Sequence, residues 1–427
     1  SWQSATRPRP AWLDSYESWA MRSDFANAPA EWAKRSFGEF CEEVRRPAGS
    51  AKYPILSVSK DLGIVLQSEK FKKRIASADT SRYKRVRYGE FAYDPMLLWS
   101  GSIARQERVD EGIISPAYYA FRVDHTVDHD FLFQFLKWER MNQIYADISV
   151  GTNTRRRKAS FDAFCGLTFP LPPLPEQKKI AAILASVDEA IQATEAVIEQ
   201  TRRVKEGLLQ DLLTRGIGHT RFKETEIGEI PESWEAPLLD TVAQRGSGHT
   251  PSKKHPEYWN GGIKWVSLAD SHALDRVYLS ETDKEISAQG IDNSSAVLHP
   301  AGTVFVSRDA SVGRSAIAAC ELAVSQHFIA WRCGPKLNNR YLYYFLQSHK
   351  SSFERIAVGS TIKTIGLGYF KRLRVPLPPK PEQDAIAEQL FSHDECIDAE
   401  LRQLEGLQQI KAGLLQDLLT GAVRVAP

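Results

Sequence analysis

The sequence has little that would mark a membrane, secreted or metal-binding protein. It contains no run of about 18 apolar residues, and residues 1–32 lack the apolar core of a signal peptide. Its five cysteines are scattered and show no CxxC spacing, which indicates reduced thiols in a cytoplasmic protein and argues against zinc or a disulfide framework. The net charge of +2 indicates no partner by itself, because nucleic-acid binding needs a basic face and not a basic average.

The motifs of common enzymes are also missing. The sequence has no GxxxxGK[ST] phosphate loop, no HExxH metal helix and no GxSxG nucleophile elbow. It lacks the Asn/Asp-Pro-Pro-aromatic tetrapeptide of amino-methyltransferases, since Asp94-Pro95-Met96 has no second proline. The ten histidines show no ligand spacing. We therefore predict no catalytic residue, no metal site and no cofactor bound by this chain.

The sequence does contain an internal repeat of one long segment. Residues 170–214 (PLPPLPEQ…GLLQDLLT) and 376–420 (PLPPKPEQ…GLLQDLLT) align without a gap and match at about 25 of 45 positions. A different stretch of about 160 residues precedes each copy. The predicted domains are a first module at 1–169, a first helical region at 170–218, a second module at 219–375 and a second helical region at 376–427.

Each repeat is predicted to be one long helix. The proline-rich opening prevents an earlier start, and Pro175 and Pro381 suit the first helical position because no bonded N–H is needed there. Apolar residues then recur at three-four spacing, and Gly216, Gly218 and Gly421 provide the ends. About 40 residues would span roughly 60 Å. We expect the two helices to pair as a coiled coil, although a stripe of this kind is also typical of a core-facing helix.

The modules have a mixed α and β pattern. Short β-rich runs at 53–58, 63–67, 303–307 and 328–332 are separated by glycine and proline. Each module ends with a short aromatic helix, at 131–136 and 341–346. We interpret these aromatic residues as helix core and not as stacking platforms. The two modules are predicted to be diverged copies of one α+β fold.

The basic residues of both modules are clustered, several of them in loops rich in glycine, serine and threonine. Such loops can reach phosphate through amides and hydroxyls, while arginine can also contact guanine edges. A solvated charged face is the alternative for any single cluster. The candidates for DNA contact are Arg82, Lys84, Arg85, Arg87, Arg105, Arg155 and Arg156 in the first module and Lys253, Lys254, Arg308, Arg314 and Lys363 in the second.

These features together resemble the specificity (S) subunit of Type I restriction–modification systems along nearly the whole chain. The resemblance rests on the duplicated openings and on the shared GLLQDLLT endings. Within the modules it rests on residues 227–234 (IGEIPESW), 249–270, 302–317 and, in the first module, Trp32, 37–40 and 112–118. The leader before Trp32 is longer than the family pattern.

The resemblance implies an α+β fold with two similar target-recognition domains, each with a small twisted β-sheet and helices. Two long helices would join them as an antiparallel coiled coil with pseudo-two-fold symmetry. It implies a cytoplasmic, non-catalytic subunit of a phage-defence complex that binds double-stranded DNA. Two modification subunits using S-adenosylmethionine, and restriction subunits using ATP and Mg, would be its partners; no membrane is involved.

Near-identical helices suggest two equivalent docking sites for two identical partners. The predicted scaffold or docking residues are Glu176, Gln177, Leu208, Leu209, Leu212, Glu382, Gln383, Leu414, Leu415 and Leu418. Packing between the helices alone would explain the leucines equally well. Two other functions stay open from the sequence: a nuclease or methyltransferase that acts alone, and a coiled-coil adaptor that never contacts DNA.

Overall fold

The computed structural model describes residues 25–26, 28–71, 76–151, 157–359 and 363–425. The chain divides into two compact units. Unit 1 comprises Ser1–Ala193 with Leu404–Pro427, and unit 2 comprises Thr194–Gln403. Each unit therefore contains one module and one half of each long helix.

The two long helices are α7 (Leu174–Thr214) and α13 (Lys380–Thr420), of 41 residues each. One long helix per repeat is thereby confirmed, with each start one residue ahead of the proline predicted to open it. After the ends, Gly216 and Gly421 adopt positive φ angles of 65° and 77°. A Cβ on Gly421 would lie 2.3 Å from Pro29 Cδ, so this turn has no room for a side chain.

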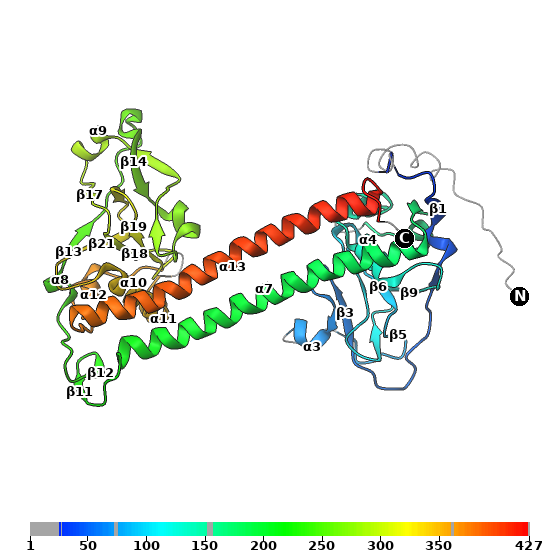
Figure 1. The fold of residues 1–427 in the computed structure, drawn as a ribbon, viewed down its shortest axis with the longest axis horizontal. Coiled ribbons are helices and arrows are strands. Elements are labelled where there is room, and N and C mark those ends of the chain that lie inside the picture. Colours follow the sequence, from blue (N-terminus) through cyan, green and yellow to red (C-terminus); the bar gives the residue numbers. More distant parts are fainter. Residues whose placement is uncertain (1–24, 27, 72–75, 152–156, 360–362, 426–427) are drawn as a thin grey trace, which may run out of the picture. The chain divides into compact units, whose positions relative to one another are not determined.

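Inside each unit the two helix halves run antiparallel (Figure 1). In unit 1 the beginning of α7 packs beside the end of α13, and Lys411 Nζ lies 2.6 Å from Asp188 Oδ1. In unit 2 the end of α7 packs beside the beginning of α13, and Lys205 Nζ lies 2.5 Å from Asp394 Oδ1. The two ion pairs join equivalent positions of the repeat, so the same helix pairing occurs in both units.

The module of unit 1 is built around one antiparallel sheet of order β2-β9-β6-β7, with the smaller pairs β1-β10, β3-β4 and β5-β8. Its strands are β1 (Ala33–Ser36), β2 (Cys41–Glu43), β3 (Leu56–Ser59), β4 (Gly63–Leu66), β5 (Lys84–Arg87), β6 (Phe91–Tyr93), β7 (Ile103–Arg105), β8 (Glu111–Ile114), β9 (Tyr119–Val123) and β10 (Thr168–Leu171). Its short helices are η1 (Phe37–Glu39), α3 (Gln67–Lys70), η2 (Leu98–Ser100), α4 (His129–Lys137), α5 (Arg140–Asp147) and α6 (Phe161–Cys165).

The module of unit 2 contains two sheets, of order β13-β21-β18-β19-β15 and β16-β14-β20-β17, and the hairpin β11-β12. Its strands are β11 (Phe222–Thr225), β12 (Gly228–Pro231), β13 (Ala243–Ser247), β14 (Trp259–Val266), β15 (Tyr278–Leu279), β16 (Lys284–Ile286), β17 (Leu298–His299), β18 (Val304–Ser307), β19 (Ser315–Ala318), β20 (Leu322–Val324) and β21 (Phe328–Cys333). Its short helices are α8 (Leu239–Val242), η4 (Pro256–Tyr258), η5 (Leu268–Ala273), α9 (Ala288–Asp292), α10 (Asn339–Ser348), α11 (Lys350–Ile356) and α12 (Leu367–Lys371).

The aromatic helices α4 and α10 occupy corresponding places after the last central strand of their modules. Asp128 caps α4 by accepting hydrogen bonds from the amides of Asp130 and Phe131, and Asn338 caps α10 by accepting one from Tyr341. The aromatic side chains of both helices lie in the cores, as predicted, with Phe131, Phe135, Tyr341 and Tyr344 fully buried. The two modules thus share a central sheet and a capped aromatic helix.

Each core also receives apolar residues from both long helices. In unit 1 these are Ile180 and Leu184 from α7 and Leu418 and Leu419 from α13. In unit 2 they are Leu212 and Leu213 from α7 and Ile386 and Leu390 from α13. The beginning of one helix and the end of the other are therefore parts of the same core. Within the described residues, no helix is both long and apolar enough to cross a bilayer.

Truncation of a core leucine on α13 tests this packing. Leu390 is 0% exposed, so we expect Leu390→Ala to lower the free energy of unfolding by about 2–5 kcal/mol through lost burial and a cavity. Leu401 lies on the same helix and is 38% exposed, so Leu401→Ala should change it by only about 0.5 kcal/mol. Urea denaturation of both variants measures the difference. Equal effects would contradict the packing.

Candidate nucleic-acid interface

The geometry of the modules depends first on how they are held by the helices. A glutamine in the first turn of each long helix is almost completely buried, Gln177 at 2% and Gln383 at 0% exposure. Gln177 donates to the Pro172 carbonyl (2.8 Å) and accepts from the amide of the cap residue Asp128 (2.8 Å). One side chain therefore joins the proline break, the long helix and the start of α4.

Gln383 makes the corresponding contacts in unit 2. Its Nε2 donates to the carbonyls of Pro378 (2.8 Å) and Lys336 (2.9 Å), and its Oε1 accepts from the amide of the cap residue Asn338 (2.9 Å). Both glutamines are the Q of the PEQ string in the repeat. The PEQ string occurs in both repeats because each module needs the same contact between this glutamine, the proline break and the cap residue of the aromatic helix.

The glutamate of the same string binds a tryptophan and a cation. In unit 1, Glu176 accepts from Trp32 Nε1 (3.3 Å) and from Arg424 Nε (2.8 Å), which follows the end of α13. In unit 2, Glu382 accepts from Trp234 Nε1 (3.0 Å) and lies 2.8 Å from His219 Nε2, which follows the end of α7. A carboxylate in the first helical turn also interacts favourably with the helix dipole. In each unit this glutamate therefore connects the start of one long helix to the module tryptophan and to the residues that follow the end of the other long helix.

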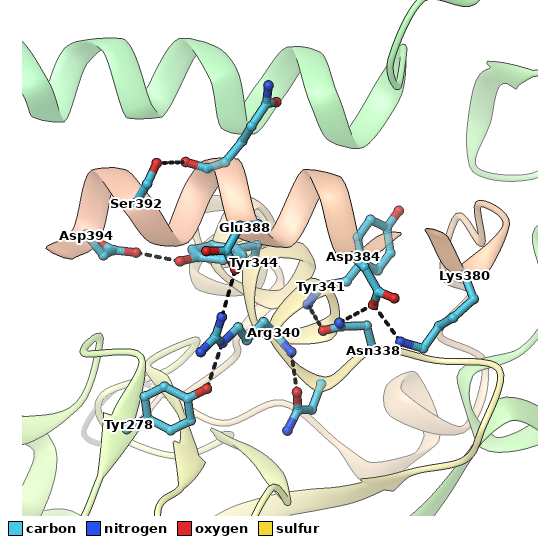
Figure 2. A network of polar contacts seen from close by, with 12 residues as sticks. Tyr278, Asn338, Arg340, Tyr341, Tyr344, Lys380, Asp384, Glu388, Ser392 and Asp394 are labelled. Carbon is cyan, nitrogen blue, oxygen red and sulfur yellow. Dashed lines mark hydrogen bonds and ion pairs between the residues drawn. The ribbon is translucent and has the colours of Figure 1, made fainter. Parts of the chain in front are cut away.

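Further polar contacts connect α13 to α10 in unit 2 (Figure 2). Asp384 Oδ1 accepts from Asn338 Nδ2 (2.6 Å) and from Lys380 Nζ (2.5 Å). Arg340 donates to Glu388 Oε2 (3.1 Å) and to the Tyr278 hydroxyl (2.7 Å). The Tyr344 hydroxyl donates to Asp394 (2.7 Å), the residue that also pairs with Lys205 of α7. Successive turns of α13 therefore fix the orientation of α10.

The residues predicted as scaffold or docking sites make contacts within the chain. Besides the glutamates and glutamines, Leu212 and Leu418 are buried in the cores of units 2 and 1. The leucines that pack partly buried against these cores are Leu208 and Leu209 in unit 2 and Leu414 and Leu415 in unit 1. The buried members of this set, Glu176, Gln177, Gln383, Leu212 and Leu418, are each at most 7% exposed.

In the first module, most of the predicted DNA contacts lie on or beside β5, whose partner is β8. Arg82 is exposed in the turn before β5, while Arg85 and Arg87 face Glu111 at 3.8 and 3.2 Å. Arg85 also donates to the Tyr53 hydroxyl (3.0 Å). This strand gathers basic side chains, but Glu111 partly neutralises them.

Two other basic residues of this module are engaged internally. Lys84 donates to the Tyr118 carbonyl (2.6 Å), and burial lowers the pKa of its ammonium group. Arg105 is 15% exposed and pairs with Asp130 at 2.6 Å, in the first turn of α4. Its place is that of a structural ion pair between β7 and α4. The predicted contacts Arg155 and Arg156 lie outside the described residues.

In the second module the loops at one end of the central sheet come together. Arg308 and Arg314 belong to the loop between β18 and β19, and Ala310 N donates to the Lys363 carbonyl (3.0 Å). Arg314 donates to the Ser271 carbonyl (2.6 Å) and faces Asp275, so its side chain connects the β18–β19 loop to η5 and the residues after it. Lys253 and Lys254 are exposed, and within the described residues their ammonium groups have no partner.

Four residues that were not predicted from the sequence extend this group. The Thr250 hydroxyl donates to Gln326 Oε1 (2.5 Å), Gln326 Nε2 lies 3.4 Å from His327 Nε2, and His327 Nδ1 lies 2.9 Å from Asp309 Oδ2. The chain of contacts runs from the loop with Lys253 to the loop with Arg308. The available signal was the polar pair Gln326-His327 inside the apolar run from Leu322 to Trp331. Among the described residues, no group of three or more His, Cys, Asp or Glu could hold a metal ion.

Replacing the buried glutamine tests the attachment of the module. Gln383→Ala leaves two carbonyls and the Asn338 amide without partners, so we expect a loss of about 1–3 kcal/mol in unfolding free energy. Gln389→Ala is the matched control, because Gln389 is exposed on the same helix, and should change it by about 0.5 kcal/mol. Thermal unfolding followed by circular dichroism gives the comparison. A control as damaging as Gln383→Ala would refute the role of this contact.

The chain is similar over most of its length to proteins of one family. The family profile described as "Type I restriction modification DNA specificity domain" matches residues 99–201 and 231–409. The specificity subunit of the type I restriction enzyme MjaVIII from Methanocaldococcus jannaschii is 26% identical over 93% of this chain and 94% of its own. The putative MjaX specificity subunit from the same organism is 25% identical over 95% and 96%.

Solved structures show the same fold. A chain from a type I R-M system, studied for its complex assembly and conformational transition, has a TM-score of 0.58 at 18% identity, covering 93% of this chain and 100% of that one. The S subunit of a Type I restriction-modification system from M. genitalium has a TM-score of 0.56 at 14% identity, covering 92% and 96%. At these identities the likeness concerns the fold alone.

Proposed function

We propose that this chain, which belongs to the Type I restriction modification DNA specificity family, reads a bipartite DNA site with its two modules, one half-site each. It is a DNA-recognition subunit, and its relatives are named specificity subunits, so the catalytic steps belong to other subunits of the complex. The observation that carries the proposal is the double attachment. Two modules with different loops are held by the same Glu–Trp and Gln–cap contacts to the same kind of helix pair.

Different loops should read different bases. The polar chain from Thr250 to Asp309 belongs to the second module, whereas the first module offers the strand β5 with Arg85 and Arg87. Lysines such as Lys253 and Lys254 would neutralise phosphates, which gives affinity without sequence preference. The half-sites are therefore proposed to differ, and the whole site to be asymmetric.

The helices α7 and α13 are proposed to set the length of DNA between the half-sites. An α-helix rises 1.5 Å per residue and is stiff over this length, so 41 residues correspond to about 60 Å. A base pair that no module reaches would not be read. The helix pair would therefore define an unread spacer.

The partners are proposed to be two modification subunits, joined by restriction subunits in the full complex. Exposed apolar residues on the helices support two equivalent docking surfaces: Val204 is 41% exposed and Ile410, its equivalent in the repeat, is 56% exposed. S-adenosylmethionine would be bound by the modification subunits, and ATP with Mg by the restriction subunits. We place the assembly in the cytoplasm, with the DNA it reads.

Exchange of one module tests the division of labour. Replacing residues 219–375 by the corresponding module of a relative should change one half of the methylated sequence and leave the other half and the spacer unchanged. The motif is read by sequencing DNA methylated by the full chain assembled with its modification subunits and S-adenosylmethionine. Replacing residues 25–169 is the matched control and should change only the other half. Changes in both halves from either exchange would contradict the proposal.

A further inference from the structure

Arg308 differs from the other basic residues of the second module in how it is held. Its amide donates to the His327 carbonyl (2.9 Å), and its carbonyl accepts from the amide of Ile365 (2.9 Å). Two loops that are distant in sequence therefore grip its backbone. Its side chain is only 20% exposed, unlike the exposed Lys253 and Lys254. Such a residue keeps one position relative to the sheet.

The Arg308 side chain has a fixed orientation, but not all of its hydrogen-bond donors have partners. Asp309 Oδ1 lies 3.7 Å from Arg308 Nε, and the same carboxylate accepts from His327 Nδ1 (2.9 Å), since a carboxylate can only accept. Arg308 Nε is buried without a hydrogen-bond partner. Within the described residues, no hydrogen bond or ion pair involves its two Nη groups. The guanidinium therefore keeps both of its Nη amino groups available as donors in a planar fork.

The loop conformation around Arg308 also departs from the ordinary. Ala310 has a φ of 57°, a left-handed conformation that a residue with a Cβ seldom adopts. The strain is held by the hydrogen bond from Ala310 N to the Lys363 carbonyl (3.0 Å) and by that from Ser307 Oγ to the Asp309 carbonyl (2.9 Å). Strained loops persist where the surrounding structure enforces them, and they are concentrated at functional sites.

The first module has no arginine at the corresponding place. Within unit 1, Ala159 N donates to the Pro95 carbonyl (3.0 Å), and Ala159 lies two residues before α6. Within unit 2, Ile365 N donates to the Arg308 carbonyl, and Ile365 lies two residues before α12. Pro95 thus takes the position of Arg308 and offers no donor. The chemistry at this position is specific to one module.

We propose that Arg308 is a specificity-determining residue that reads a guanine in the half-site of the second module, with Asp309 as its positioning residue. This rests on the proposed function, in which that module binds DNA. The Nη groups of an arginine match the O6 and N7 acceptors of guanine in the major groove. A lysine ammonium can also reach these acceptors, but it is a single flexible group without the planar fork and holds the pair less rigidly. Lys253 and Lys254 would contact phosphates of the same half-site.

The test uses the full chain assembled with its modification subunits and maps the methylated motif of each variant. Arg308→Ala should relax the motif at one G·C pair of one half-site, with a loss of discrimination of about 10-fold to 100-fold there. The other half-site and the spacer should stay unchanged. Arg332→Ala is the matched control. Arg332 is exposed and lies near the end of β21, whereas Phe328, which pairs with Ser307 beside Arg308, lies at its beginning. This substitution should leave the motif intact.

Arg308→Lys separates base reading from charge. It should keep the salt dependence of binding to non-specific duplex, while discrimination at the same G·C pair falls because one flexible ammonium does not match the planar fork. If the Arg308→Ala chain fails to assemble with its partners, the Arg308→Lys variant still tests whether Arg308 reads the base. An unchanged motif in Arg308→Lys, or equal weakening at every sequence, would overturn the inference and leave the proposed function standing. A wild-type complex with no defined motif would overturn the proposed function, and this inference with it.

Discussion

The buried glutamine at the start of each long helix is the contact on which the structure depends. Gln177 and Gln383 each satisfy a carbonyl of the proline break and the amide that begins an aromatic helix. A buried polar group without partners is costly, so the helix start and the module are stable only in this relative position. The neighbouring glutamate adds a tryptophan and a cation from beyond the end of the other helix.

This arrangement explains which parts of the repeat are alike. The PEQ openings bind the modules, and the GLLQDLLT endings supply Leu212 and Leu418 to the two cores. The middle of each helix carries exposed residues such as Val197 and Leu401, and there the copies differ. Similarity is therefore greatest where the helices complete a module. Unit 1 is discontinuous in the chain because its core needs the beginning of α7 and the end of α13, whereas unit 2 is the continuous segment Thr194–Gln403 that contains the end of α7 and the beginning of α13.

The sequence predicts the elements better than their contacts. The repeat period, the proline breaks and the aromatic runs are local signals, and they gave the long helices and the buried helices α4 and α10 correctly. A local signal cannot show that Arg105 pairs with Asp130 inside the first module, because the partners are brought together only by the fold. The same holds for Gln326 and His327, whose link to Asp309 and Thr250 spans separate loops. Charge clusters alone therefore do not show which basic side chains form ion pairs within their own module.

In the proposed function, paired helices hold two different reading modules at a set separation. Inserting one matched heptad into each helix, between Ile191 and Val204 of α7 and at the equivalent positions of α13, tests this separation. Seven residues add about 10 Å to a helix. With the motif mapped by sequencing of methylated DNA, we expect a longer unread spacer between unchanged half-sites. A spacer of unaltered length flanked by altered half-sites would contradict it.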